Sequence, residues 1–210
     1  MTFLDDFFDV LLKPAAGFKR LAEGKSIYAG LLIYLSVVII SNLSSINTVH
    51  PGEIARDMEQ MGLVLPASFI GSLPQVLPFL SIITVLTFGP AFFLGRTALV
   101  SLSAVLLKGE GDVRSLGLVF GYAQLPYILI APASLLSRVV NFEFLGLVSA
   151  AIFIWVIVLR VIALRSVYNL STGRSILAVF LPFLVVLFSL LFFFLFMGAF
   201  MSPLLAELFI

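Results

Sequence analysis

Five long apolar stretches, separated by short polar segments, dominate the hydrophobic pattern of the chain. A helix needs about 20 predominantly apolar residues to cross a bilayer, and each stretch reaches that length. The pattern therefore predicts an all-α integral membrane protein, a five-transmembrane-helix bundle that forms one membrane domain over residues 1–210. The second stretch exceeds the required length, so we expect a tilt, a projecting end or a kink near Pro90. The expected spans are about residues 27–46, 76–107, 116–136, 144–164 and 176–201.

A short amphipathic segment at residues 3–12 precedes the first span. Drawn as a helix, it has one acidic face with Asp5, Asp6 and Asp9. The opposite face is apolar and consists of Leu4, Phe7, Phe8, Leu11 and Leu12. Such a helix lies in the membrane interface or packs on the ends of the protein's own helices, and both alternatives stay open. Pro14 is expected to end or kink it, because proline lacks the backbone N–H. Between the first two spans, residues 54–62 predict a short surface helix.

The composition supports a membrane protein and excludes several kinds of chemistry. Hydrophobic residues make up 61% of the chain and charged residues only 11%, against about 25% charged in soluble domains. The absence of cysteine excludes disulfides, thiolate metal sites and a cysteine nucleophile. The single histidine and the lack of a hydrolase, metalloprotease or nucleotide-binding motif argue against an enzyme. We expect no catalytic residue, no metal, no cofactor and no nucleic-acid partner.

Lysine and arginine flank the spans unevenly, and this asymmetry predicts the orientation. With the N-terminus in the cytoplasm, only Arg56 and Arg138 face outward, and the C-terminus lies outside. The expected location is the inner membrane, where basic residues at the surface attract anionic lipid headgroups by about 1 kcal/mol each. The basic residues expected at the cytoplasmic side are Lys13, Lys19, Arg20, Lys25, Lys108, Arg114, Arg165 and Arg174, of which the first four form a membrane-surface cluster.

Arg96 and Arg160 are the charges that lie inside apolar runs. A cation at the centre of a span costs about 2.5–3.5 kcal/mol on insertion scales, and no aspartate or glutamate lies within a span to offset it. One interpretation is a cytoplasm-facing anion or lipid site, to which Lys108 and Arg114 are further candidates. The alternative is that each arginine extends its side chain to the nearby interface.

The third span has the most distinctive local sequence, GYAQLPY at residues 121–127, followed by Pro132. Small residues such as Gly121 allow close helix approach. Pro126 and Pro132 remove backbone hydrogen bonds, and Tyr122 and Gln124 are candidate partners for the freed carbonyls. The segment predicts either the centre of the bundle or a kinked packing helix.

These motifs together resemble the Yip family, membrane proteins named for interaction with Ypt/Rab GTPases. The similar features are Leu11–Leu12–Lys13–Pro14, the glycine-containing loop 109–112, the GYAxxP motif at 121–126 and the polar connection 169–174. The resemblance implies a five-helix bundle with the N-terminus inside and the C-terminus outside. The short N-terminal segment is similar to that of a prokaryotic-type member, so Rab binding is not carried over. Arg174–Ser175–Ile176 departs from the basic-then-alanine pair of the family.

The sequence and the resemblance lead to two functional hypotheses of different classes. The first is a non-enzymatic membrane protein that organises lipids or membrane-protein partners, alone or as a homo-oligomer. The alternative is a transporter, channel or lipid-translocating protein in which Arg96, Arg160 and the proline-broken third span line a passage. Flux through purified proteoliposomes separates the two.

Overall fold

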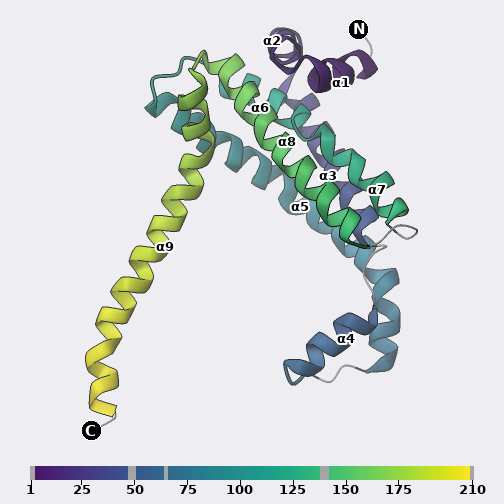
Figure 1. Cartoon of the computed structure of the whole chain (residues 1–210), viewed down its shortest axis with the longest axis vertical. Helices are drawn as coiled ribbons and strands as arrows, with labels where there is room; N and C mark the ends of the chain where they lie inside the picture. The colour runs from purple at the N-terminus through teal and green to yellow at the C-terminus, as the bar shows by residue number, and fades with distance from the viewer. Residues whose placement is uncertain (1–2, 47–50, 64–65, 138–141, 209–210) are drawn as a thin grey trace.

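The computed structural model describes residues 3–46, 51–63, 66–137 and 142–208, and the elements in these ranges are all helical (Figure 1). Five helical segments among the described residues are long and apolar enough to cross a membrane. This confirms the predicted fold class, an all-α integral membrane protein with five spans. The spanning elements are α3 (Ile27–Ile46), α5 (Ala67–Leu106), α6 (Val113–Tyr122) with η1 (Leu125–Leu129) and α7 (Ile130–Leu136), α8 (Phe142–Tyr168) and α9 (Thr172–Leu208).

Three further helices lie outside the spans: α1 (Phe3–Leu12), α2 (Pro14–Gly24) and α4 (Pro51–Gln60). The second of these was not predicted. Pro14 does not end the helical structure but occupies the first position of α2, where a missing N–H costs no hydrogen bond. Helix α4 is the expected surface helix, and Gly62 follows it in the left-handed region at φ +78°. Arg138, expected to face outward, lies outside the described residues.

Helix α1 packs against α2 rather than lying alone. Val10 is fully buried and Asp6 is 2% exposed, so both face the protein. Asp6 therefore does not share an outward polar face with Asp5, as the helical drawing suggested. Phe8 and Leu12 stay exposed on the other side of α1, where a membrane interface would meet them.

The ends of the helices that carry most of the basic residues gather at one end of the molecule, called here the basic end. It comprises α1, α2, the start of α3, the α5–α6 connection and the α8–α9 connection, and it lies at the top of Figure 1. The opposite end holds α4 and the last turns of α9. Lysine and arginine are therefore concentrated at one end of the molecule. Such an asymmetry sets the orientation of a membrane protein when it inserts.

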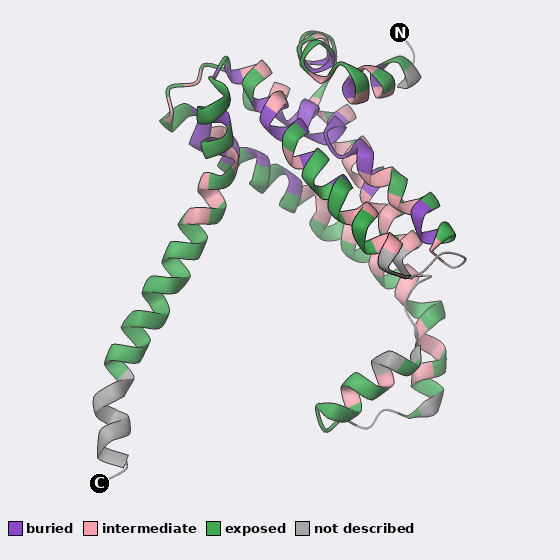
Figure 2. Ribbon diagram, viewed as in Figure 1, coloured by how far each residue is buried: buried purple, intermediate pink, exposed green. Residues whose placement is uncertain are grey.

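The third span lies at the centre of the bundle. Buried residues make up 67% of it, against 6% in the second and fifth spans. Figure 2 shows this concentration of burial around α6, whereas most of α9 is exposed. Helix α9 packs on α5 and α8 near its start and then diverges from the other helices (Figure 1). Much of the apolar surface of α5 and α9 is consequently left for lipid to cover.

The central position of α6 depends on glycines at its contact with α3. A Cβ atom on Gly121 would collide with the backbone of Gly30. A Cβ atom on Gly30 would lie 2.6 Å from the Cα of Leu118 and 2.7 Å from the Gly117 carbonyl oxygen. Real Cβ atoms do not approach backbone this closely, so neither position accepts a side chain without separating the two helices.

We predict that Gly121→Ala destabilises the bundle by about 1–3 kcal/mol, the usual cost of overpacking a close contact. The measurement is the apparent unfolding temperature in detergent, followed through the fluorescence of the single tryptophan. Gly146→Ala on α8 is the matched control, because nothing lies within 4 Å of a Cβ atom there. The control should keep or slightly raise the unfolding temperature, since alanine favours helix. Equal unfolding temperatures for Gly121→Ala and the unmodified protein would contradict the prediction.

Candidate anion-binding site

Arg96 on α5 and Arg160 on α8 lie within the spans, on helices that meet the basic end. At 1.5 Å per residue they lie roughly 12–15 Å from the ends of their helices. Arg160 is only 6% exposed, whereas Arg96 is exposed on the surface of α5. Arg160 therefore points into the protein and Arg96 lies at the edge.

The Arg160 side chain lies within electrostatic range of the second cation, Arg96. The electrostatic neighbours of Arg160 are Arg96, Tyr34 and Tyr127. The Nε of Arg160 is buried without a hydrogen-bond partner, and among the described residues neither arginine makes an ion pair with a carboxylate. Two cations thus share a region of low polarity in which phenol groups are the polar neighbours. Such an arrangement is unfavourable unless water or an anion compensates the charges.

Four elements position the polar groups of this site. Tyr34 comes from α3, and its ring stacks on Phe93 of α5 with 4.7 Å between ring centroids. Tyr127 comes from η1, and its backbone carbonyl accepts a hydrogen bond of 3.1 Å from the Ser41 hydroxyl of α3. Since both tyrosines are anchored to neighbouring helices, the site is bounded by groups with restricted motion. An anion with several oxygen atoms could accept hydrogen bonds from both guanidinium groups at once.

Arg96 also lines a groove of about 790 Å³ between α5 and α9. The other lining side chains are apolar, with phenylalanines on both helices. The site therefore combines a buried cation at Arg160 with a second cation that is reached from the lipid-facing side.

The other two residues predicted for the anion or lipid site, Lys108 and Arg114, lie apart from the arginine pair. Both are exposed at the α5–α6 connection of the basic end. This connection contains the glycine-containing loop at residues 109–112. A Cβ atom on Gly111 would lie 2.6 Å from the Val167 carbonyl oxygen, and the Glu110 N–H donates to the Tyr168 carbonyl at 3.2 Å. The loop is thus fitted against the end of α8.

Asp112 caps α6 by accepting a hydrogen bond of 3.0 Å from the Ser115 N–H. Partial burial acts to raise the pKa of this carboxyl group, but the backbone hydrogen bonds from Ser115 and Arg114 outweigh it and lower the pKa. The carboxylate form that caps the helix is therefore favoured. This cap fixes the start of the central span.

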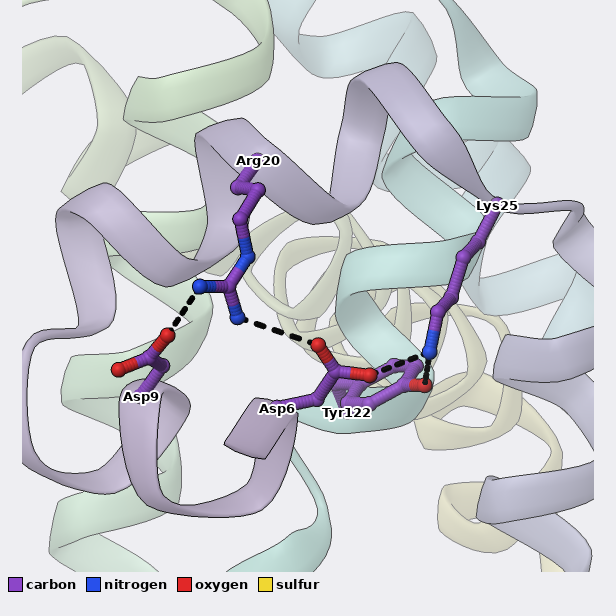
Figure 3. A network of polar contacts seen from close by, with 5 residues as sticks. All are labelled: Asp6, Asp9, Arg20, Lys25 and Tyr122. Atoms are coloured by element: carbon purple, nitrogen blue, oxygen red, sulfur yellow. Dashed lines mark hydrogen bonds and ion pairs between the residues drawn. The ribbon is translucent and has the colours of Figure 1, made fainter. Parts of the chain in front are cut away.

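A network of charged groups holds α1 and α2 on the bundle (Figure 3). The buried carboxylate of Asp6 accepts hydrogen bonds from Arg20, at 3.1 Å, and from Lys25. Arg20 forms a second ion pair with Asp9. Lys25 donates to the Tyr122 hydroxyl at 3.1 Å, and its Nζ lies 5.5 Å from the centroid of that ring. The hydrogen bond to Asp6, opposed by partial burial and aided by Tyr122, raises the pKa of Lys25.

The membrane-surface cluster expected from the sequence therefore divides into two pairs. Arg20 and Lys25 are bound to acidic side chains of the protein itself. Lys13 and Lys19 are exposed on the outer side of the basic end. Asp6 is the buried member of this network, and its contacts were not predicted from the sequence. The sequence shows an aspartate followed 14 and 19 residues later by two basic residues. Their contact arises only because α2 folds back along α1.

The distinctive residues of the third span lie in the core, except for Pro132, which is exposed. Gly121 makes the contact with α3, and Tyr122 is 1% exposed. Gln124 is 6% exposed, Pro126 lies in the 3₁₀ segment η1, and Pro132 lies in α7. The Tyr122 hydroxyl bonds to Lys25 rather than to a carbonyl freed by proline. The hydroxyl that bonds a carbonyl of the interrupted segment belongs to Ser41.

A fold of this kind, with five apolar spans, defines a multi-pass membrane protein. The family model described as the Yip1 domain matches residues 8–194 of the chain. Because this match covers most of the sequence, the chain belongs to the Yip family, as its motifs indicated. No curated protein and no solved structure matches the chain.

We predict that Asp6→Asn loosens the attachment of α1 and α2 to the bundle. The substitution removes the charge that pairs with Arg20 and Lys25, and both partners are about one-third exposed, which reduces the effect. A loss of about 1–2 kcal/mol for this local attachment is expected. Limited trypsin digestion of the full-length protein in detergent should then cleave faster after Lys19 and Arg20.

Glu23→Gln is the control for this experiment, because Glu23 is an exposed carboxylate on the same helix pair. Cleavage of this variant should proceed at the rate of the unmodified protein. If Asp6→Asn were cleaved no faster than Glu23→Gln, the network would not be what holds the helices.

Proposed function

We propose that this Yip-family protein binds and organises anionic lipids in the inner membrane, and that Arg96 and Arg160 hold the anionic headgroup. The observation that carries the proposal is the buried Arg160 side chain, whose Nε has no hydrogen-bond partner, within electrostatic range of a second arginine. A buried cation without a carboxylate partner destabilises a fold, so its presence is explained best by a ligand that supplies the negative charge.

A lipid is favoured over a soluble anion by the position of the pair. The arginines lie within spans, and Arg96 lines a groove with otherwise apolar walls. The exposed Lys13 and Lys19 at the basic end would attract the same headgroups at the surface. No step of covalent chemistry is part of this function. Recruitment of a membrane-protein partner or a second copy of the chain would be a consequence of lipid organisation.

The proposed orientation places the basic end in the cytoplasm, because cytoplasmic segments carry the excess of lysine and arginine. The chain contains no cysteine, so single-cysteine variants report accessibility without background. We predict that Lys13→Cys reacts with a membrane-impermeant maleimide only after permeabilisation. Glu59→Cys on α4 should react in intact cells. The opposite labelling pattern would reverse the proposed orientation.

We predict that Arg160→Gln reduces retention of an anionic lipid about tenfold or more, since hydrogen bonds to charged groups contribute about 1.5–3 kcal/mol. The measurement is native mass spectrometry of protein equilibrated with equal amounts of phosphatidylglycerol and phosphatidylcholine. The unfolding temperature should stay equal or rise, because the variant removes an uncompensated buried charge.

Arg174→Gln is the matched control, because Arg174 is exposed at the start of α9. It should retain phosphatidylglycerol like the unmodified protein. An equal loss of phosphatidylglycerol retention in Arg160→Gln and Arg174→Gln would mean that the lipid responds only to the net charge of the protein. The proposal would then fail. Anion or lipid flux in proteoliposomes that Arg160→Gln abolishes would instead favour the transport alternative, in which the 3₁₀ interruption beside the arginines lines a passage.

A further inference from the structure

The groove between α5 and α9 contains Arg96 and is formed by one face of each helix. On α5 its wall contains Phe88, Phe92, Gly95 and Arg96, which recur at helical spacing. On α9 the facing wall includes Phe183. The volume of about 790 Å³ lies within the about 300–1,000 Å³ that ligand sites usually have.

The walls of this groove are apolar except at one point. The phenylalanine side chains are exposed along it, Phe92 by 76% and Phe183 by 64%. Gly95 leaves a gap directly beside Arg96, because nothing lies within 4 Å of a Cβ atom built there. A ligand that fits must be elongated and apolar, and it must carry a negative charge where Arg96 lies.

The positive charges of Arg96 and Arg160 favour one class of membrane lipid over the others. Arg96 lines the groove, and its electrostatic neighbour Arg160 is a 94% buried cation with an unpartnered Nε. A neutral or zwitterionic lipid would cover the apolar walls but would add no net negative charge at the arginines. An anionic lipid supplies both features, since its headgroup compensates the guanidinium groups and its chain covers the phenylalanines.

We propose that the α5–α9 groove is the acyl-chain site of an anionic lipid whose headgroup lies between Arg96 and Arg160. The inference rests on the proposed function and adds where the chain of the lipid lies. It also explains the divergence of α9 from the bundle, because a lipid chain occupies the space that helix packing leaves open.

The test uses phosphatidylglycerol with a photoreactive diazirine in its acyl chain, added to the full-length protein in nanodiscs. After illumination, peptide mapping should find the label in residues 88–99 of α5 and 179–186 of α9. Gly95→Leu fills the gap beside Arg96 and should reduce this labelling several-fold. Gly146→Leu is the control, because Gly146 also has no atom within 4 Å of a Cβ position but lies on α8.

Each outcome bears on the inference. Loss of groove labelling in Gly95→Leu, with normal folding and normal labelling in Gly146→Leu, supports it. Equal groove labelling by a phosphatidylcholine probe would overturn it, because the groove would then be ordinary lipid-facing surface. Protection by inorganic phosphate as effective as by unlabelled phosphatidylglycerol would overturn it in favour of a free anion.

Two further outcomes separate this inference from the proposed function. Retention of phosphatidylglycerol that depends on Arg160, with the label outside the groove, would refute the acyl-chain site alone. Absence of selective phosphatidylglycerol retention in the unmodified protein would refute both proposals.

Discussion

The contact between Gly30 of α3 and Gly121 of α6 is the constraint on which the rest of the structure depends. Because both residues lack a side chain, two backbones meet in the centre of the bundle. The next residue, Tyr122, is thereby placed within reach of Lys25, and the following segment η1 lies against Ser41. One close approach thus positions the network at the basic end and also the tyrosine beside the arginines.

The fold class follows from the length and hydropathy of the apolar runs, since no other solvent than lipid accommodates five of them. The ends of the helices follow less well. Backbone hydrogen bonding continues beyond the last apolar residue, so α8 reaches Tyr168 and α5 begins at Ala67. Helix α2 escaped prediction because Pro14 was taken as a helix breaker, whereas proline at the first position of a helix is favourable.

Arg96 and Arg160 stand out in the sequence as charges in apolar runs, so the candidate residues could be named without a structure. Their proximity could not, because it depends on how α5 and α8 pack around the third span. The roles of Tyr34 and Tyr127 are equally hidden, since both look like ordinary aromatic residues of apolar helices. Asp6 was misplaced for a related reason, because a single-helix drawing cannot show that α2 supplies its partners.

Some basic residues of the chain have carboxylate partners and others have none, and this difference supports the proposed function. Arg20 and Lys25 receive carboxylate partners from α1, although both remain partly exposed to solvent. The Arg160 side chain, which is far more buried, receives none among the described residues. Burial makes an uncompensated charge more costly. Stability alone would therefore favour a carboxylate partner for the buried Arg160 over partners for the partly exposed Arg20 and Lys25, and the structure has the opposite arrangement. Under the proposed function, an anionic headgroup from the membrane supplies the missing negative charge, and because a lipid can leave, the site would respond to the lipids around it.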